Sequence, residues 1–305
     1  MSSVSVVILT RNSELTIGQC LEAVAALSSL VENVVVVDGC STDSTLEIVK
    51  NFRERLHIVI LSDQGHGLGY ARDIGWRSVS SPYVIMLDSD VIIPPDFPTE
   101  AMKVLQLDSR VGGVAAKLRP VILEKGWLAA FQAKNLGVHL HLREPVYPYE
   151  APALHTACTM YRRSALEAVD GFDHSFFFAK EDSDISFKLR KAGYKLYYLG
   201  VEAQHLERAR LCKMNFRYGR SYVQIYKKHP DMVPLLTPKN ILLAAALLFP
   251  LLQVIVYLNY LLKYWGLPDL KNVEKVVLSF IEVVRQLLRT AGMLYELFRK
   301  LVGPR

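Results

Sequence analysis

Two carboxylates stand two positions apart in Asp88-Ser89-Asp90, directly after the apolar run at residues 83–87. In an extended backbone, residues i and i+2 point to the same side, so we expect both carboxylates to face one ligand. Hard oxygen donors in this arrangement suit Mg²⁺ or Mn²⁺ that bridges a pyrophosphate. Solvated acids in a turn produce the same pattern, so the interpretation depends on the motifs that accompany it.

Polar residues also end two earlier apolar runs. One segment is Thr10-Arg11-Asn12, and the other is Asp38-Gly39-Cys40-Ser41-Thr42-Asp43. A carboxylate at the end of a strand can accept a hydrogen bond from an imide or a ribose hydroxyl, and a following glycine lets the backbone approach closely. Ser, Thr and Asp in these segments also suit helix caps, so each segment alone is ambiguous.

Three glycines, at positions 65, 67 and 69, have the spacing GxGxG. Tyr70 stands where a dinucleotide-binding fingerprint needs its third glycine, which argues against a nicotinamide oxidoreductase. We therefore expect a permissive loop beside a nucleotide, with Gly67 in it. Arg72 follows this loop, and its guanidinium matches phosphate oxygens. An ordinary surface arginine is the alternative.

Glu181 and Asp182 open a predicted helix at 182–192. The helix dipole by itself favours acids in a first turn. A carboxylate there can also be the general base that removes a proton from a sugar or lipid acceptor. His205 follows a predicted strand at 194–199, and a neutral imidazole can complete the coordination of a metal. The neighbouring arginines that could offset diphosphate charge are Arg208 and Arg210.

Apolar strands and helices alternate over the first 120 residues. The predicted strands are Val4–Thr10, 33–38, 57–61 and 83–87, and the predicted helices are 14–27, 42–52 and 69–79. This alternation predicts an α/β fold with a mainly parallel sheet flanked by helices. Ligands bind such sheets beyond the carboxyl ends of the strands, so the polar segments should converge on one edge. Further elements are expected at 126–141 (helix) and Cys158–Arg162 (strand).

The last third of the chain has a different composition. Residues 200–305 hold 16 of the 36 basic residues but only 7 of the 30 acidic ones. Residues 241–262 contain no charge and are long enough, as one helix, to cross a hydrocarbon core. Pro250 in the middle could instead kink this helix or turn it back. Because the basic residues flank an apolar stretch, we expect anionic lipid, and no nucleic acid, as a partner.

Residues 273–301 place apolar side chains on one helical face and charged ones on the other. Such a helix can lie on a membrane surface or join subunits into a homo-oligomer. The sequence thus predicts a catalytic domain at 1–230 and membrane-associated helices at 231–305. The four dispersed cysteines predict free thiols in a reducing compartment, and the N-terminus does not resemble a signal peptide.

Taken together, the motifs resemble the family-2 inverting glycosyltransferases of GT-A fold, in the order typical of that family. The GT-A fold implies a Rossmann-like sheet that is mixed but mainly parallel, flanked by helices. The matching segments are Thr10-Arg11-Asn12, Asp38 to Asp43, Ala71-Arg72-Asp73-Ile74-Gly75, Asp88-Ser89-Asp90, Tyr161 to Asp173, Glu181 to Tyr194, and His205. Two positions depart from the family pattern. Asp73 replaces an asparagine, and Lys188 stands where arginine is common.

The resemblance implies a role for each matching residue. Thr10, Arg11, Asn12 and Asp38 would hold the nucleoside, Arg72 the diphosphate, and Asp88 and Ser89 the ribose side of the donor. Asp90 would bind Mn²⁺ or Mg²⁺ together with Asp88 and His205. Asp182 would be the catalytic base, and Glu181 would shape the acceptor site.

These expectations describe a membrane-associated enzyme facing the cytoplasm. It would move a sugar from a UDP- or GDP-sugar to a lipid-linked or glycan hydroxyl. A polyprenyl-phosphate sugar synthase of the dolichol-phosphate-mannose-synthase type is an alternative, although that branch has D-x-D-x-Q and Ile92 stands at the last position. A catalytically inert membrane scaffold is another alternative. A sugar nucleotidyltransferase should open with a Gly-rich basic loop, which this chain lacks.

Overall fold

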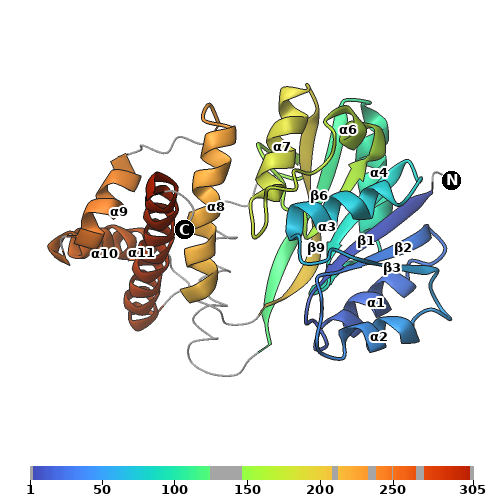
Figure 1. Cartoon of the computed structure of the whole chain (residues 1–305), viewed down its shortest axis with the longest axis horizontal. Helices are drawn as coiled ribbons and strands as arrows, with labels where there is room; N and C mark the ends of the chain where they lie inside the picture. Colours follow the sequence, from blue (N-terminus) through green and yellow to red (C-terminus); the bar gives the residue numbers. More distant parts are fainter. Residues whose placement is uncertain are drawn as a thin grey trace. The chain divides into compact units, whose positions relative to one another are not determined.

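A computed structural model of the chain describes residues 3–123, 146–207, 212–232, 238–248, 250–265 and 271–302. The chain divides into two compact units. The described part of the first unit holds a nine-stranded mixed sheet (Figure 1). Its path runs β3-β2-β1-β4-β8-β6-β9-β5, and β7 pairs with β9.

The N-terminal half of the sheet consists of parallel βα units. Its elements are β1 (Val4–Thr10), α1 (Ile17–Ala25), β2 (Val31–Asp38), α2 (Thr45–Asn51), β3 (Ile58–Ser62), α3 (Leu68–Arg77) and β4 (Tyr83–Asp88). Alternate residues of β1 face opposite sides, with Val6 and Ile8 in the core beneath α1 and Val7 and Leu9 in the core beneath α3 (Figure 1). Burial on both faces explains why these strands are continuous apolar runs.

The other half of the sheet is largely antiparallel. Its elements are β5 (Val91–Ile92), α4 (Phe97–Leu107), β6 (Val111–Ile122), β7 (Tyr149–Glu150), β8 (Cys158–Arg162), α6 (Arg163–Ala168), α7 (Glu181–Lys191) and β9 (Lys195–Glu207). Strand β8 runs antiparallel to β4 and β6, whereas β6 and β9 are parallel. The prediction of a parallel sheet is therefore confirmed for β1 to β4, and the whole sheet is mixed.

The second unit is helical in its described part. Its helices are α8 (Cys212–Lys228), α9 (Pro238–Leu248), α10 (Pro250–Trp265) and α11 (Asn272–Val302). A Cβ at Gly219 of α8 would lie 1.8 Å from the Arg289 carbonyl oxygen, and one at Gly292 of α11 would lie 2.0 Å from that of Phe216. These two glycines let the backbones of α8 and α11 approach closely. The helical unit thus includes α8, which lies within residues 1–230 of the predicted catalytic domain. The boundary after residue 230 stays a prediction.

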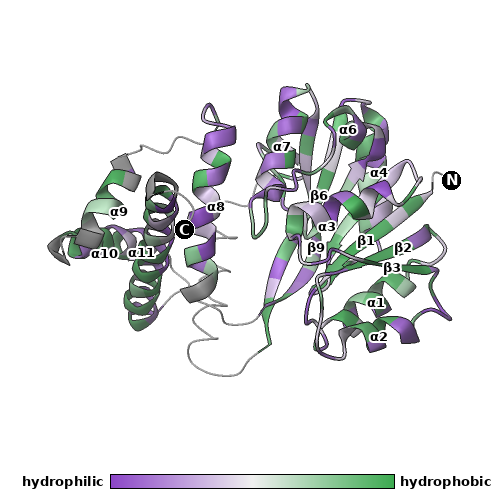
Figure 2. Cartoon of the chain, viewed as in Figure 1, coloured by the Kyte–Doolittle hydropathy of each residue, from purple (hydrophilic) through white to green (hydrophobic). Residues whose placement is uncertain are grey.

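The apolar segment 241–262 does not form one helix, because α9 ends at Leu248 and α10 begins at Pro250. Proline lacks an N–H and is favoured at the first position of a helix. Among the helices that the structure describes, none is both long and apolar enough to cross a membrane. The predicted helix at 273–301 is confirmed as α11, and long hydrophobic stretches run along α10 and α11 (Figure 2). The predicted helix at 126–141 lies outside the described residues.

Candidate active site

Strand register places three of the predicted residues at one edge of the sheet. Thr10 pairs with Asp38, Asp38 with Ser62, and Leu9 with Asp88. The carboxyl ends of β1 to β4 therefore coincide, as expected for ligand binding in sheets of this type. The predicted convergence of the polar segments after these strands is confirmed.

Hydrogen bonds join the two loops that follow β1 and β2. Asp38 accepts bonds from the Ser41 backbone N–H (2.9 Å) and hydroxyl (2.5 Å). Asn12 donates its backbone N–H to the Ser41 hydroxyl oxygen and accepts from the Thr42 N–H. Beneath these loops the Thr10 hydroxyl is buried and has no partner among the described residues. The loops form a preorganised polar surface, and a buried hydroxyl of this kind is a ready partner for a ligand.

Arg72 lies inside the site. Its Nη2 donates to Asp88 Oδ1 (2.9 Å) and its Nε to Glu181 Oε1 (3.1 Å), and the residue is 2% exposed. The guanidinium is turned toward two internal carboxylates, and its Nη1 is buried without a hydrogen-bond partner among the described residues. The role of Arg72 at a diphosphate stays a prediction. Burial disfavours its charge, but Asp88 and Glu181 outweigh that effect and raise the pKa of Arg72. One cation balances two acids, and burial raises the pKa of Glu181, the more deeply buried acid.

Asp182 follows Glu181 in the first turn of α7 and is half-buried. Its Oδ1 accepts from the Ser183 N–H (2.6 Å) and hydroxyl (3.2 Å). These two donors hold the carboxylate at the first turn of the helix, where the helix dipole favours an acidic side chain. Since Arg72 connects Glu181 to Asp88, the chain from β4 to α7 brings Asp182 to the edge where the strands end. An ionised carboxylate there can accept a proton from a nucleophile.

Asp90 and His205 meet where β5 pairs with β9. Strand β5 pairs with β9 so that Val91 stands opposite His205, and the Leu206 N–H donates to the Asp90 carbonyl (2.7 Å). The two side chains approach within 3.4 Å, between His205 Nε2 and Asp90 Oδ1. Burial disfavours the charged imidazole, but Asp90 and Glu207 outweigh it and raise the pKa of His205 to about 10.

The donor set at Asp90 and His205 fits a small divalent cation. Neighbouring ligands of Mg²⁺ or Mn²⁺ stand about 3 Å apart when each lies about 2.1 Å from the metal. Within the described residues no cluster of three or more His, Cys, Asp or Glu is arranged to hold a metal ion. Two protein ligands suit a cation that takes its other oxygens from substrate phosphates and water.

The two acids of Asp88-Ser89-Asp90 do not share one direction. Strand β4 ends at Asp88, and the turn that follows ends the two-residue alternation of side chains. Asp88 Oδ1 is bound to Arg72, whereas Asp90 faces His205. Ser89 is buried, and its hydroxyl donates to that of Ser13, so its role here is to link two loops.

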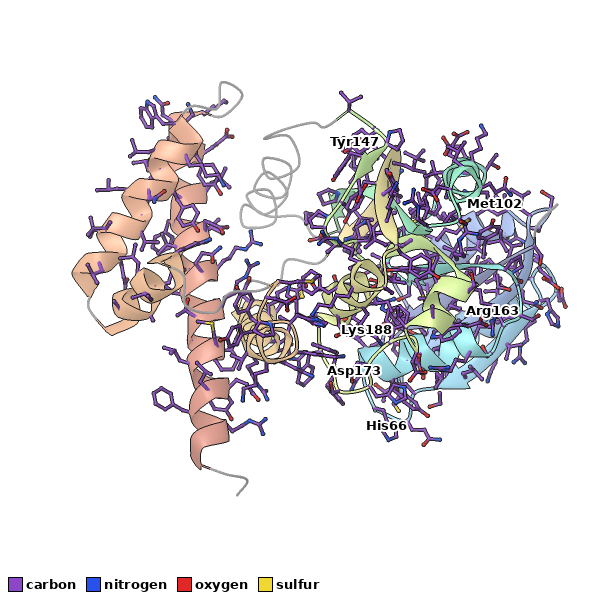
Figure 3. The ribbon with its side chains drawn as sticks, turned by 90° about the horizontal axis from the view of Figure 1, so that it is seen from above. His66, Met102, Tyr147, Arg163, Asp173 and Lys188 are labelled. Atoms are coloured by element: carbon purple, nitrogen blue, oxygen red, sulfur yellow. The ribbon has the colours of Figure 1, made fainter. Side chains whose placement is uncertain are left out.

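Gly67 is required by packing. A Cβ at this residue would lie 2.6 Å from the Phe177 carbonyl oxygen, which accepts the Leu68 N–H (3.1 Å). A Cβ at Gly69 would lie 2.1 Å from the carbonyl oxygen of Asp173. Figure 3 shows His66, just before α3, and Asp173 on the same side of the first unit. The glycine spacing therefore serves close contact between the start of α3 and the loop before α7. The expected donor-binding role of Gly67 stays a prediction.

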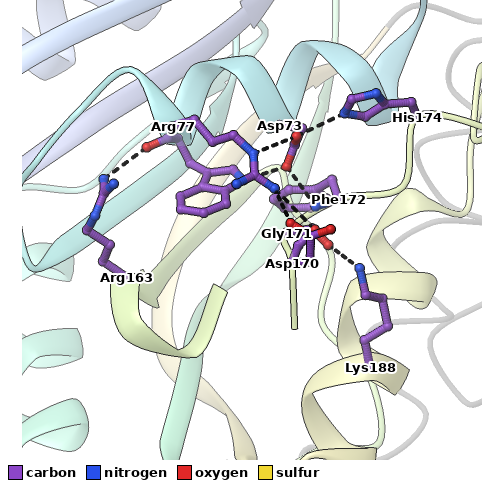
Figure 4. Close-up of polar contacts among 9 residues, drawn as sticks. Asp73, Arg77, Arg163, Asp170, Gly171, Phe172, His174 and Lys188 are labelled. Carbon is purple, nitrogen blue, oxygen red and sulfur yellow. Dashed lines mark hydrogen bonds and ion pairs between the residues drawn. The ribbon is translucent and has the colours of Figure 1, made fainter. Parts of the chain in front are cut away.

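Both departures from the family pattern belong to one polar network (Figure 4). Asp73 accepts hydrogen bonds from Trp76 Nε1 (2.8 Å), Arg77 Nε (2.8 Å), His174 Nε2 (2.9 Å) and the Phe172 N–H (3.1 Å). Burial opposes the charge of Asp73, but the donors outweigh it and lower its pKa. In the same network the ammonium of Lys188 donates to the carbonyl oxygen of Gly171. The network joins the loop at 170–174 to α3 and α7.

Two further residues of the site, His155 and Glu207, belong to none of the sequence motifs. His155 Nε2 donates to the Ala116 carbonyl (2.9 Å), which leaves Nδ1 unprotonated, buried and without a partner among the described residues. Burial lowers the pKa of His155 to about 4, and the charges of Asp182 and Asp88 also act on this imidazole. Glu207 lies 3.2 Å from His205 Nδ1. Its position two residues after His205 on a strand was an available signal. Arg208 and Arg210 lie outside the described residues.

Residues 5–170, more than half of the chain, match the family described as Glycosyl transferase family 2. The succinoglycan biosynthesis protein ExoA of Rhizobium meliloti (strain 1021) is 27% identical over 246 residues, which cover 73% of each protein. The poly-beta-1,6-N-acetyl-D-glucosamine synthase of Staphylococcus aureus (strain COL) is 24% identical over 192 residues. That match covers 61% of this chain and 45% of the synthase, so the chain spans less than half the length of that relative.

Solved structures share the fold. The mannosyltransferase PcManGT from Pyrobaculum calidifontis, in complex with GDP-Man and Mn²⁺, gives a TM-score of 0.64 at 19% identity, covering 97% of this chain and 87% of its own. S. aureus TarS 1–349 in complex with UDP-GlcNAc gives 0.53 at 17% identity, covering 92% and 90%. These similarities support the GT-A-like mixed sheet flanked by helices.

Proposed function

Because this chain belongs to glycosyl transferase family 2 and is a glycosyltransferase, we propose that it is an inverting, metal-dependent enzyme with a hydroxyl acceptor on a glycan or a lipid-linked glycan. The observation that carries the proposal is the chain of contacts Asp88–Arg72–Glu181. It brings the acid at the start of α7 to the edge where Asp38 and Asp88 end their strands and where Asp90 meets His205.

The proposed reaction is a single in-line displacement. The acceptor oxygen attacks the anomeric carbon of the donor sugar, the bond from that carbon to the diphosphate oxygen breaks, and Asp182 takes the acceptor proton. Thr10 and Asp38 hold the nucleoside. Asp90 and His205 would hold Mn²⁺ or Mg²⁺, and a divalent cation at this place would stabilise the negative charge of the departing nucleoside diphosphate. Attack from the face opposite the leaving group inverts the anomeric configuration.

The donor is proposed to be a UDP- or GDP-sugar. Among the similar structures, TarS 1–349 holds UDP-GlcNAc and PcManGT holds GDP-Man with Mn²⁺. The choice of a hydroxyl acceptor over a polyprenyl phosphate is supported by a need for a base: a hydroxyl must lose its proton, whereas a phosphate acceptor is already ionised. Asp182 at the site edge meets that need.

A thermal-shift panel with UDP-GlcNAc and GDP-Man, each with and without Mn²⁺, tests the donor and the metal. A bound donor stabilises the folded chain by mass action, so one donor should raise Tm, and more so with Mn²⁺. The variant Asp182→Asn should keep this shift but lose turnover by on the order of 10²–10⁴-fold. Glu54→Gln, at an exposed carboxylate of the same unit, is the matched control. Near-normal turnover of Asp182→Asn would show that Asp182 is not the base.

We also propose that the helical unit binds the cytoplasmic face of a membrane. Exposed apolar side chains of α10 recur at helical spacing: Val254, Ile255, Leu258, Leu262 and Trp265, each about half exposed or more. The surplus of basic residues in the last third of the chain suits an anionic surface. A helix of this kind lies in the interface with its apolar face buried among lipids.

Sedimentation with vesicles checks the membrane proposal. Vesicles containing phosphatidylserine should bind the protein, purely zwitterionic vesicles should bind it more weakly, and Leu258→Asp with Leu262→Asp should release it. A second copy of the chain is the competing occupant of this face. If the wild type were a dimer in solution and the same variants made it monomeric without any vesicle binding, the membrane proposal would be overturned.

A further inference from the structure

Glu207 stands beside the expected metal ligand His205 and is not a member of any motif. Its Oε1 lies 3.2 Å from His205 Nδ1, while His205 Nε2 lies 3.4 Å from Asp90 Oδ1. The imidazole therefore lies between two carboxylates, one on each ring nitrogen. About a quarter of each of the His205 and Glu207 side chains is exposed, compared with 41% of Asp90.

The backbone holds this arrangement firmly. His205 and Glu207 are alternate residues of β9, opposite Pro120 and Ile122 of β6. The Leu123 N–H donates to the Glu207 carbonyl (3.0 Å), and the Leu206 N–H donates to the Asp90 carbonyl (2.7 Å). Strand alternation places side chains i and i+2 on one side of a sheet, so the Glu207 carboxylate and the imidazole are neighbours by construction.

The contact between Glu207 and His205 determines which nitrogen of the imidazole carries a proton. An ionised carboxylate can only accept hydrogen bonds, so the contact with Glu207 places a proton on Nδ1. By the same rule Asp90 keeps a proton on Nε2 while no cation is bound. A cation needs an unprotonated ring nitrogen, so it would have to replace the proton on Nε2, and Glu207 would keep the proton on Nδ1. Carboxylates that hold a metal-binding histidine in this way raise its basicity and fix its ring orientation.

We infer that Glu207 is a positioning residue for the divalent cation: it fixes the ring and the tautomer of His205 so that Nε2 faces the cation together with Asp90. The inference rests on the proposed function, because it concerns the metal site of that reaction. It assigns Glu207 no contact with the cation or the sugar donor.

Mn²⁺ binding to the full chain, measured by the loss of the free Mn²⁺ EPR signal in the presence of UDP or GDP, tests this role. Glu207→Ala should weaken Mn²⁺ binding about 10–100-fold. Glu207→Gln should stay within a few fold of the wild type, because its amide oxygen still accepts the Nδ1 hydrogen. Glu202, elsewhere on β9, contacts Lys117 and Arg119. The control variant Glu202→Ala should therefore leave the Mn²⁺ affinity unchanged. Equal losses in Glu207→Gln and Glu207→Ala would overturn the inference, because a metal ligand or a required charge behaves in that way.

A second measurement separates positioning from folding. Nitrogen-15 NMR of labelled histidine in the Mn²⁺-free protein, above about pH 10 where His205 is neutral, should show Nδ1 protonated in the wild type and a shift toward the Nε2 tautomer in Glu207→Ala. An unchanged tautomer would refute the inference. The variant Asp90→Ala shows which proposal fails. If Mn²⁺ still binds Asp90→Ala, the proposed metal site is wrong. If Asp90→Ala loses Mn²⁺ affinity and Glu207→Ala does not, only the role of Glu207 is refuted.

Discussion

Asp88 and Asp90 are two residues apart, yet their partners differ in kind. Asp88 is bound to Arg72, a buried permanent cation that also holds Glu181. Asp90 faces His205, a group that can lose its proton, and the Asp90 side chain is 41% exposed compared with 31% for Asp88. One acid is thus committed to an internal ion pair, and the other can exchange its partner for a metal ion.

The difference separates two tasks within one edge of the sheet. A buried arginine between two acids cannot leave without exposing unpaired charge, so the Asp88–Arg72–Glu181 cluster fixes β4, α3 and α7 relative to one another. The Asp90–His205 pair lies where a ligand can replace the mutual contact of its members. Substitutions in the first cluster should therefore act mainly on stability, and substitutions in the second mainly on metal binding and turnover.

Arg72→Met should have the largest effect. Removing the guanidinium leaves Asp88 and Glu181 without their cation, and loss of one partner from a buried ion pair costs about 3–5 kcal/mol of unfolding free energy. Urea denaturation measures the change. Arg53→Met, at an exposed position on the same unit, should change stability by no more than about 0.5 kcal/mol. A loss in Arg72→Met as small as in the control would show that the cluster does not hold the fold together.

Asp90→Asn should have the opposite effect, with a large loss of turnover and a small loss of stability. We expect a loss of turnover on the order of 10²–10³-fold, because a weakened metal site no longer stabilises the leaving group. Unfolding free energy without metal should fall by much less than in Arg72→Met, since the Asp90 carboxylate is partly solvated and Glu207 still faces His205. Steady-state kinetics over a range of Mn²⁺ concentrations and urea denaturation give both numbers. Full activity at saturating Mn²⁺ would leave only a binding role for Asp90, and a large stability loss would erase the contrast with Asp88.

The two imidazoles of the site extend the comparison to pH. Burial lowers the pKa of His155 to about 4, below the value of about 6.5 for an unfolded chain. Between pH 6.5 and pH 4 the unfolded chain therefore binds a proton that the folded chain does not, and stability falls as the pH falls through this window. The contribution is about 2 kcal/mol for a partly exposed residue. His155→Gln should flatten the pH dependence of unfolding by urea, whereas His57→Gln, at an exposed histidine, should not. An unchanged slope in His155→Gln would disprove the assignment.

Sequence patterns predicted the parallel half of the site well. In βα units the ligand-binding residues follow the strands directly, so the ends of β1, β2 and β4 could be located from apolar runs alone. The direction of Arg72 could not be predicted. Helix α3 buries Gly69, Ala71, Arg72 and Asp73 together with Trp76, and such a mixture of small and charged residues gives no apolar period.

The antiparallel half was less predictable. The predicted strand at 194–199 continues as β9 to Glu207, because the backbone beyond residue 199 is paired with β6 and β5. Sequence periodicity reports burial, and the end of β9 is only partly buried, so Glu207 was not recognised. The division of 241–262 into two helices depended on Pro250, which the sequence identified as a possible kink without fixing its outcome.

The smallest effect is expected at Asp73, which stands in neither cluster. Asp73→Asn restores the residue usual in the family but replaces one oxygen with an NH₂ group that cannot accept from Arg77 or His174 (Figure 4). Because both partners are about half exposed, the loss of unfolding free energy should be about 1–2 kcal/mol, with turnover almost unchanged. Arg77→Gln, which removes one partner and keeps the carboxylate, is the control and should cost less. If Asp73→Asn lost most of its turnover while remaining folded at the assay temperature, Asp73 would belong to the catalytic part of the site. The loop at 170–174 would then belong to that part as well.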